Sequence, residues 1–203
     1  MVVTTNVGIV VYENVEVLDL GGPYEVFTTA SRLHARTHPA DPALFRVFTL
    51  GREAGPVTAR AGLTVSADHS FDDHPAIDVL IVPGGLVASV MCDLDLAGWL
   101  RAVAATAQLT VSVCTGAFIL AQAGLLDGRA ATTHWEDIDV LAERYPAVRV
   151  VRGRRWVDEG AVVTAAGVSA GIDMSLHLVE RLAGRELAVS TARQMDYDWL
   201  HQT

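Results

Sequence analysis

The chain has 203 residues, of which 51% are hydrophobic and 19% charged, and 15 Lys and Arg against 24 Asp and Glu give a formal net charge of −9. A chain of this length can bury one substantial core, so we expect a single domain over residues 1–203. The acidic balance argues against nucleic acid and anionic membrane surfaces as partners, because both select basic proteins. The two cysteines form no Cys-x-x-Cys pair, which excludes a disulfide framework and a structural zinc cluster.

The first residues contain no basic leader followed by an apolar stretch, so we expect a cytoplasmic protein. The mean hydropathy of +0.31 is high. Its apolar runs, however, are only a few residues long, whereas a membrane-spanning helix needs about 20. Short β-branched runs bounded by Gly and Pro are typical of a parallel sheet that is covered on both faces.

The predicted elements alternate between strands and helices. Pro23 suits a first helical turn, so the first helix is predicted to begin near Gly21. The His, Pro and Arg residues over 33–42 indicate a surface connection, and residues 52–70 a short hairpin. Strands are expected over residues 6–12, 44–50, 77–82, 109–113, 130–133, 148–151 and 161–165, and later helices over 94–107, 136–144, 169–182 and 186–195. This alternation predicts an α/β fold with a doubly wound, mostly parallel sheet between helical layers.

Cys114 lies where the strand over residues 109–113 passes directly into a helix. Small residues stand two positions to either side of it, Ser112 and Gly116, as a nucleophile elbow requires. The N–H groups and the dipole at the start of a helix favour a thiolate, so a lowered pKa is expected for Cys114. On local sequence alone a buried core cysteine is an equally good interpretation.

Five motifs together resemble the ThiJ/PfpI superfamily, and within it most nearly the isocyanide hydratases. The resemblance covers nearly the whole chain, and the sensor domains of AraC-type regulators look similar too. It implies a flavodoxin-like fold, a homodimer, and a cysteine nucleophile with a carboxylic acid placed against it. The motifs are VLDLGGP at 17–23, VPGG at 82–85, SVCTGA at 112–117, ATTHW at 131–135 and VSAGID at 168–173.

Asp19 matches the acid and Cys114 the nucleophile of the superfamily. Many members carry Glu at the acid position and the protease-like branch has His after the cysteine, whereas the hydratases have Asp and Thr, as this chain does with Asp19 and Thr115. A carboxyl that meets a thiolate and partial burial has a raised pKa, so Asp19 can be protonated and donate to sulfur. The alternative role for Asp19 is a helix N-cap ahead of Pro23.

Three further residues are candidates for contacts with substrate. The amides of Gly85 and Thr115 are predicted to form an oxyanion site beside Cys114, although Gly85 could belong to a plain turn and the Thr115 hydroxyl could cap the helix. His134 either lies near the pocket or makes a structural hydrogen bond. His134 and Glu136 do not complete an amidotransferase triad, because related amidotransferases place that His near the chain's end, where this sequence has Gly167 and Val168.

These residues predict an enzyme that hydrates isocyanides to N-substituted formamides through Cys114 and Asp19. No cofactor and no metal are expected; the scattered histidines do not form a metal site, and Cys92 is expected to be a partly buried bystander. The alternatives are a glyoxalase or deglycase, and a ligand- or redox-sensing domain. The sensor proteins continue into a helix-turn-helix module, which we expect a chain ending at Thr203 to lack.

Overall fold

The computed structural model describes residues 2–200 and is built on a seven-stranded sheet with the order β10-β11-β7-β6-β1-β2-β5. All neighbouring strands in this sheet are parallel except β10, which pairs antiparallel with β11. The strands are β1 (Thr5–Val10), β2 (Phe45–Gly51), β5 (His69–Ser70), β6 (Val79–Val82), β7 (Leu109–Val113), β10 (Trp156–Asp158) and β11 (Val162–Ala165). The predicted α/β, flavodoxin-like architecture is confirmed.

Two short pairs of strands lie outside this sheet, one antiparallel and one parallel. Strands β3 (Gly55–Thr58) and β4 (Thr64–Ala67) form the predicted hairpin, with a 3₁₀ turn over Arg60–Gly62 between them. Strands β8 (Ala130–Ala131) and β9 (Arg149–Val150) pair with each other and not with the main sheet.

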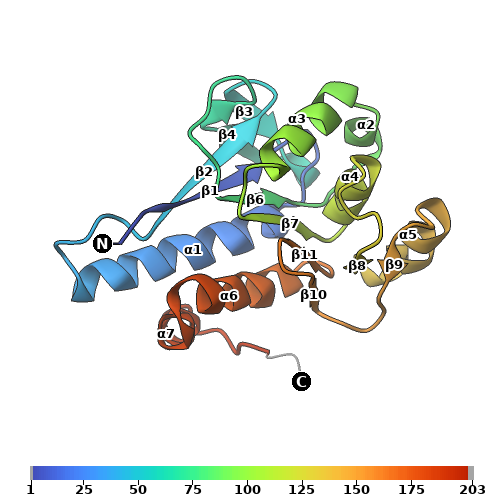
Figure 1. Ribbon diagram of the computed structural model, residues 1–203. Helices are drawn as coiled ribbons and strands as arrows, with labels where there is room; N and C mark the ends of the chain where they lie inside the picture. The colour runs from blue at the N-terminus through green and yellow to red at the C-terminus, as the bar shows by residue number, and fades with distance from the viewer. Residues whose placement is uncertain (1, 201–203) are drawn as a thin grey trace.

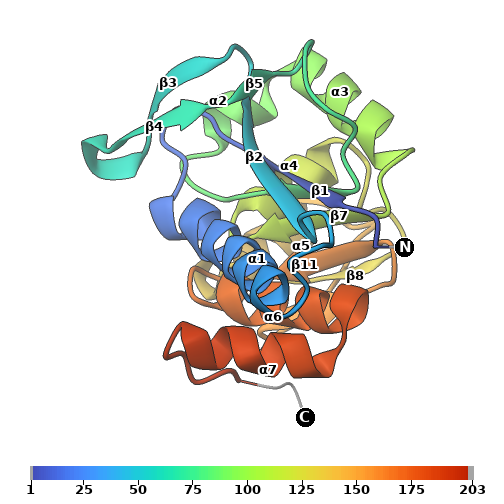
Figure 2. The ribbon, with the colours of Figure 1, turned by 90° about the vertical axis from the view of Figure 1, so that its left-hand side faces the viewer.

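Helices cover both faces of the sheet (Figures 1 and 2). Helices α1, α6 and α7 pack on one face, and α2, α3 and α4 on the other, while α5 lies beyond the edge with β8 and β9. Strands β6 and β7 are buried along their whole length because they meet apolar side chains on both faces. The helices are α1 (Val17–Thr37), α2 (Ala88–Met91), α3 (Leu94–Ala104), α4 (Gly116–Gln122), α5 (Ile138–Arg144), α6 (Ala170–Ala183) and α7 (Arg185–Gln194).

Helix α1 differs most from its prediction. It begins at Val17 rather than near Gly21, so Pro23 lies inside it, where the missing N–H costs one backbone hydrogen bond. It also runs on to Thr37, so the first half of the predicted surface connection over residues 33–42 is helix. His34 and Arg36 stand in its last turn, where positive groups suit the helix dipole.

The carboxyl ends of β1, β6, β7 and β11 lie at one edge of the sheet, because these four strands are parallel neighbours. From β1 the chain passes to β2 on one side, whereas β6 lies on the other side, so the strand order reverses between β1 and β6. Open α/β sheets bind ligands outside such a reversal. None of the helices within residues 2–200 has the length and apolar character needed to cross a membrane.

Candidate active site

Cys114 stands on a sharp turn between β7 and α4. Its φ of 56° lies in the left-handed region, which a residue with a side chain adopts only when the surroundings hold it there. The Cys114 N–H donates to the carbonyls of Ala165 and Ala166 at 3.1 and 3.2 Å. A Cβ at Gly116 would lie 2.1 Å from the carbonyl oxygen of Val82, so the turn needs glycine there. These contacts form the predicted elbow.

The Cys114 thiol is only 7% exposed. Burial, followed by the negative charge of Asp19, raises its pKa to about 12, while the N–H groups of Thr115 and Val168 act in the opposite direction. The expected lowering of this pKa is therefore wrong. The helix start does supply an amide, but loss of water around the sulfur outweighs it.

Asp19 is completely buried beside this thiol, in the first turn of α1. Its Oδ2 accepts from the Gly84 N–H at 3.1 Å, and Oδ1 has no hydrogen-bond partner of good geometry among residues 2–200. Burial raises the pKa of Asp19 to about 7, with a further contribution from the charge of Glu16. The raised pKa agrees with expectation, whereas the alternative role as an N-cap is wrong because Glu16 occupies that position.

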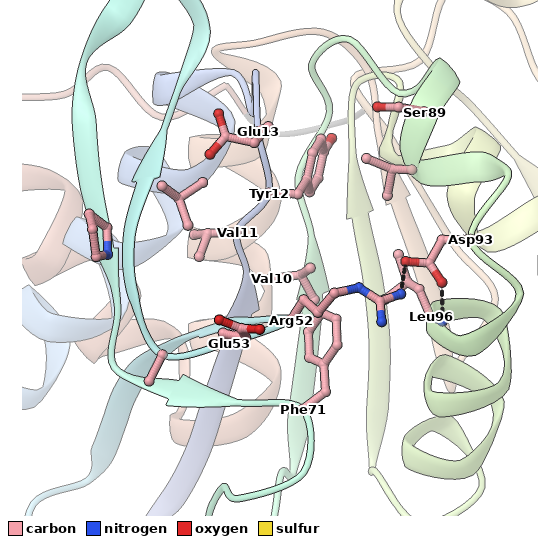
Figure 3. A pocket seen from close by; sticks show the side chains of 14 residues that line it. Val10, Val11, Tyr12, Glu13, Arg52, Glu53, Phe71, Ser89, Asp93 and Leu96 are labelled. Atoms are coloured by element: carbon pink, nitrogen blue, oxygen red, sulfur yellow. Dashed lines mark hydrogen bonds and ion pairs between the residues drawn. The ribbon is translucent and has the colours of Figure 1, made fainter.

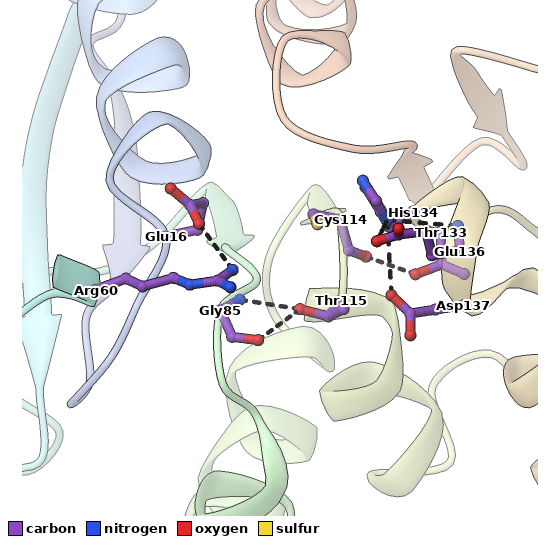
Figure 4. A network of polar contacts seen from close by, with 9 residues as sticks. All are labelled: Glu16, Arg60, Gly85, Cys114, Thr115, Thr133, His134, Glu136 and Asp137. Atoms are coloured by element: carbon purple, nitrogen blue, oxygen red, sulfur yellow. Dashed lines mark hydrogen bonds and ion pairs between the residues drawn. The ribbon is translucent and has the colours of Figure 1, made fainter.

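The Thr115 hydroxyl joins α4 to the loop after β6 (Figure 4). It accepts from the Gly85 N–H at 2.9 Å and donates to the Gly85 carbonyl at 3.0 Å, and it makes no cap bond to α4. In this arrangement the Gly85 amide is already paired, and the Thr115 amide faces the Cys114 thiol. Of the two amides of the predicted oxyanion site, that of Gly85 thus meets the Thr115 hydroxyl and that of Thr115 faces the sulfur. Their catalytic role stays a prediction.

His134 lies near the elbow but is not bonded to the thiol (Figure 4). Its Nδ1 accepts from the Glu136 N–H at 3.4 Å and lies 3.6 Å from the Glu136 carboxylate. Its ring rests on Gly167, where a Cβ would come within 1.9 Å of Cδ2. The preceding residue, Thr133, donates to the Cys114 carbonyl at 2.9 Å. The structure therefore shows a local hydrogen bond for His134 and leaves a contact with substrate as a prediction.

Several residues of the site were missed by sequence reasoning. The Tyr12 hydroxyl donates to the Pro83 carbonyl at 2.8 Å, and burial, with the charges of Asp19 and Cys114, raises its pKa. Val168 supplies an amide to the thiol, and Glu16 adds charge beside Asp19 while pairing with Arg60 at 3.2 Å. Tyr12 is the last residue of a predicted strand that ends at the same sheet edge, which is a usable signal. An amide donor such as Val168 leaves no trace in side-chain identity.

A pocket of about 560 Å³ opens beside Tyr12, at the reversal between β1 and β6 (Figure 3). Its wall is largely apolar, and an ion pair between Arg52 and Asp93 crosses it. Tyr12 lines this pocket, whereas Cys114 does not. The lining residues are Val10, Val11, Tyr12, Glu13, Arg52, Glu53, Ala54, Pro56, Val57, Phe71, Ser89, Val90, Asp93 and Leu96.

The second cysteine, Cys92, is exposed rather than partly buried. Both cysteines are free thiols. Over residues 2–200, no three His, Cys, Asp or Glu side chains are grouped so as to hold a metal ion.

The chain is similar to known proteins over most of its length. It is 34% identical over 193 residues to isonitrile hydratase of Pseudomonas putida, covering 94% of this chain and 78% of that protein. It is 35% identical over 170 residues to the HTH-type transcriptional regulator CdhR of Pseudomonas aeruginosa, covering 84% of this chain but 48% of the regulator, about half its length.

The same relationship appears in solved structures. A crystal structure of a ThiJ/PfpI family protein from Pseudomonas syringae superposes with a TM-score of 0.84 at 28% identity, over 99% of this chain and 78% of that one. The DJ-1/PfpI family matches residues 5–181. With its fold, its elbow cysteine and these matches, the chain belongs to the DJ-1/PfpI family.

Proposed function

We propose that the protein is a cysteine-dependent hydratase that converts isocyanides, also called isonitriles, into N-substituted formamides. The observation that carries this proposal is the buried pair of Asp19 and Cys114, in which a carboxyl with a pKa of about 7 adjoins a thiol. The similarity to isonitrile hydratase supports the same reaction.

In the first step, the Cys114 sulfur attacks the terminal carbon of R–N≡C, and that carbon receives one proton. A C–S bond forms and the product is a thioimidate, R–N=CH–S–Cys114. Asp19 supplies the proton, directly or through the thiol, since a group with a pKa near 7 is well matched to donate and accept protons at neutral pH.

In the second step, water adds to the thioimidate carbon while Asp19, now ionised, accepts one of its protons. The second proton of the water passes to the nitrogen, the C–S bond breaks with its electron pair on sulfur, and R–NH–CHO forms. The sum is one isocyanide plus one water giving one formamide, and Asp19 and Cys114 return to their starting state. Every step uses groups of the chain and water, and the amides of Thr115 and Gly85 are the proposed donors to the intermediate.

The proposal is tested by following formamide formation from a small aryl isocyanide by NMR. Cys114→Ala should reduce turnover by a factor on the order of 10³ or more, because it removes the attacking atom. Cys92→Ala is the matched control, since it removes the other free thiol, which is exposed rather than buried, and should leave turnover unchanged. Full activity in Cys114→Ala would overturn the assignment.

A ligand-sensing domain is the second candidate, and the similarity to a transcriptional regulator favours it. A sensor would bind an isocyanide or another small ligand without turning it over. Equilibrium binding of the aryl isocyanide without formamide formation by the wild-type protein would therefore support sensing. Methylglyoxal is the comparison substrate for the glyoxalase or deglycase alternative, which Asp19 and Thr115 disfavour because branches with that activity carry Glu and His there.

We further infer that residues 1–203 act as one domain, in the cytoplasm and as a homodimer. The two free thiols suit a reducing compartment. The exposed side chains of Leu18, Leu63 and Leu86 provide apolar surface for a second copy.

A further inference from the structure

The peptide group between Cys114 and Thr115 has two hydrogen-bonding ends, and both are used. At one end, the Cys114 carbonyl accepts from the Thr133 hydroxyl at 2.9 Å. At the other end, the Thr115 N–H lies beside the Cys114 sulfur and acts to lower the pKa of the thiol. Because a peptide group is planar, a contact that fixes the direction of its carbonyl also fixes the direction of its N–H.

Thr133 is well placed to hold this peptide group. Its side chain is almost completely buried, at 1% exposure, so its hydroxyl has little access to water as an alternative partner. The segment that carries it is anchored by the neighbouring Thr132, whose N–H donates to the Thr164 hydroxyl at 2.9 Å on β11. The second hydrogen bond to the Cys114 carbonyl, from the Ala117 N–H, is longer at 3.3 Å.

The elbow also needs such a restraint. Cys114 has a φ of 56°, a left-handed conformation that costs energy in a residue with a side chain. That φ is set by the preceding peptide, whereas rotation of the Cys114–Thr115 peptide changes ψ of Cys114 and φ of Thr115 and would turn the Thr115 N–H away from the sulfur. The Thr133 hydroxyl opposes that rotation because the rotation would break the buried hydrogen bond from this hydroxyl to the Cys114 carbonyl.

We propose that Thr133 is a positioning residue for the Cys114 nucleophile, acting through the Cys114–Thr115 peptide to aim the Thr115 N–H at the sulfur. The hydroxyl also polarises the carbonyl, which strengthens the N–H of the same peptide as a donor. A negative sulfur gains more from this donor than a neutral thiol does, so Thr133 favours the ionised form. The inference builds on the proposed role of Cys114 as the nucleophile.

The test measures the reactivity of the thiol itself. Iodoacetamide alkylates a thiolate by forming a C–S bond and expelling iodide, so the rate as a function of pH reports ionisation of Cys114. The protein carries Cys92→Ser to remove the exposed thiol. Thr133→Val removes the hydroxyl at nearly constant volume, Thr133→Ser retains it, and each variant is checked for folding by circular dichroism and thermal unfolding.

Thr133→Val should shift the pH profile of alkylation to higher pH and slow the reaction about three- to tenfold at a fixed pH below the inflection. Thr133→Ser should restore the rate to within about twofold. Thr191→Val is the matched control, since Thr191 is another fully buried threonine whose hydroxyl donates to a backbone carbonyl, that of Leu187 at 2.8 Å, in the remote helix α7. Its alkylation profile should match that of the parent.

Equal profiles for Thr133→Val and Thr191→Val would overturn the proposal. If valine disrupts the fold, Thr133→Ala makes the same comparison, and a profile like that of the parent would be equally decisive. Because alkylation requires no isocyanide, the result is independent of whether the protein proves to be a hydratase.

Discussion

Asp19 and Cys114 titrate as a pair rather than as two separate acids. The fully protonated pair loses its first proton at about pH 7, and the second proton is retained until about pH 12. Between these values the pair carries one negative charge and one proton. The shifts place this charge mainly on Asp19, and transfer of the remaining proton from sulfur to the carboxyl produces the nucleophile and the acid together.

This titration predicts how catalysis depends on pH. At pH values below about 7 both groups are protonated, and kcat/KM for the isocyanide should fall about tenfold for each further unit. Above pH 7 it should reach a plateau, because the singly charged pair then dominates. Steady-state rates between pH 5 and 9 measure this curve, and a rate that is constant from pH 5 to 9 would contradict it.

The variant Asp19→Asn serves as the test of the assignment. It removes the group that loses the first proton, so the remaining titration is that of the thiol, whose pKa stays high because the sulfur is buried. The inflection near pH 7 should therefore disappear and the activity at pH 7.5 should fall by a factor on the order of 10² to 10⁴. An unchanged inflection would assign the titration to another group.

At the level of elements, the site is made by loops that follow neighbouring parallel strands. The loop after β6 is tightly packed, since an added Cβ at Gly84 would lie 2.6 Å from Thr115 Oγ1 and 2.8 Å from Asp19 Oδ2. A larger residue at this position would push the acid and the threonine away from the elbow. Glycine here is a requirement of space, not of backbone conformation.

We predict that Gly84→Ala reduces kcat/KM by a factor on the order of 10², because a displacement of about 1 Å at the reacting groups has that effect. Gly98→Ala is the control. The nearest atom to its added Cβ is Arg101 Nη2 at 4.0 Å, and Gly98 lies within α3. That control should keep full activity and gain about 0.5–1 kcal/mol in unfolding free energy. Urea denaturation and steady-state kinetics on both variants provide the measurement. Equal activities of the two variants would refute the predicted loss in Gly84→Ala.

The elements show which features a single sequence reveals. The strand over Leu109–Val113 is predicted with its observed ends, because a short run rich in β-branched residues marks a buried parallel strand. The start of α1 was misplaced because Pro23 is usually found in a first turn, whereas here the helix continues through it. The antiparallel edge strand β10 was missed, since Trp156–Asp158 is too short to produce a pattern.

For the candidate site, the sequence likewise predicts part of what the structure shows. Asp19 and Cys114 were identified and do lie together, but the raised pKa of the thiol depends on burial, which local sequence does not report. The pairing of the Gly85 amide with the Thr115 hydroxyl is likewise a tertiary contact between residues 30 positions apart. Residue types were thus predictable, while hydrogen-bond partners were not.

Over the whole molecule, three exposed leucines surround the loop that leads into α1. Leu18 is 41% exposed in α1, and Leu63 and Leu86 are each 52% exposed. Leu86 donates its N–H to the Asn14 carbonyl at 3.1 Å, and the hairpin segment before Leu63 is attached to the same loop. The three leucines lie on segments attached to one loop next to the candidate site, and we propose that together they form an apolar rim that makes the dimer contact.

We predict that the protein sediments at twice its chain mass of 21.7 kDa. Two copies that each carry a charge of −9 repel one another, whereas apolar contacts are not weakened by salt, so dimerisation should become tighter between 0.05 and 0.5 M NaCl. Leu63→Asp should shift the protein toward the monomer by placing a charge on the apolar rim. Leu94→Asp is the matched control, because Leu94 is 78% exposed on α3, on the opposite face of the sheet from α1. A monomer at all salt concentrations would refute the dimer, and equal dissociation by both variants would place its contact elsewhere.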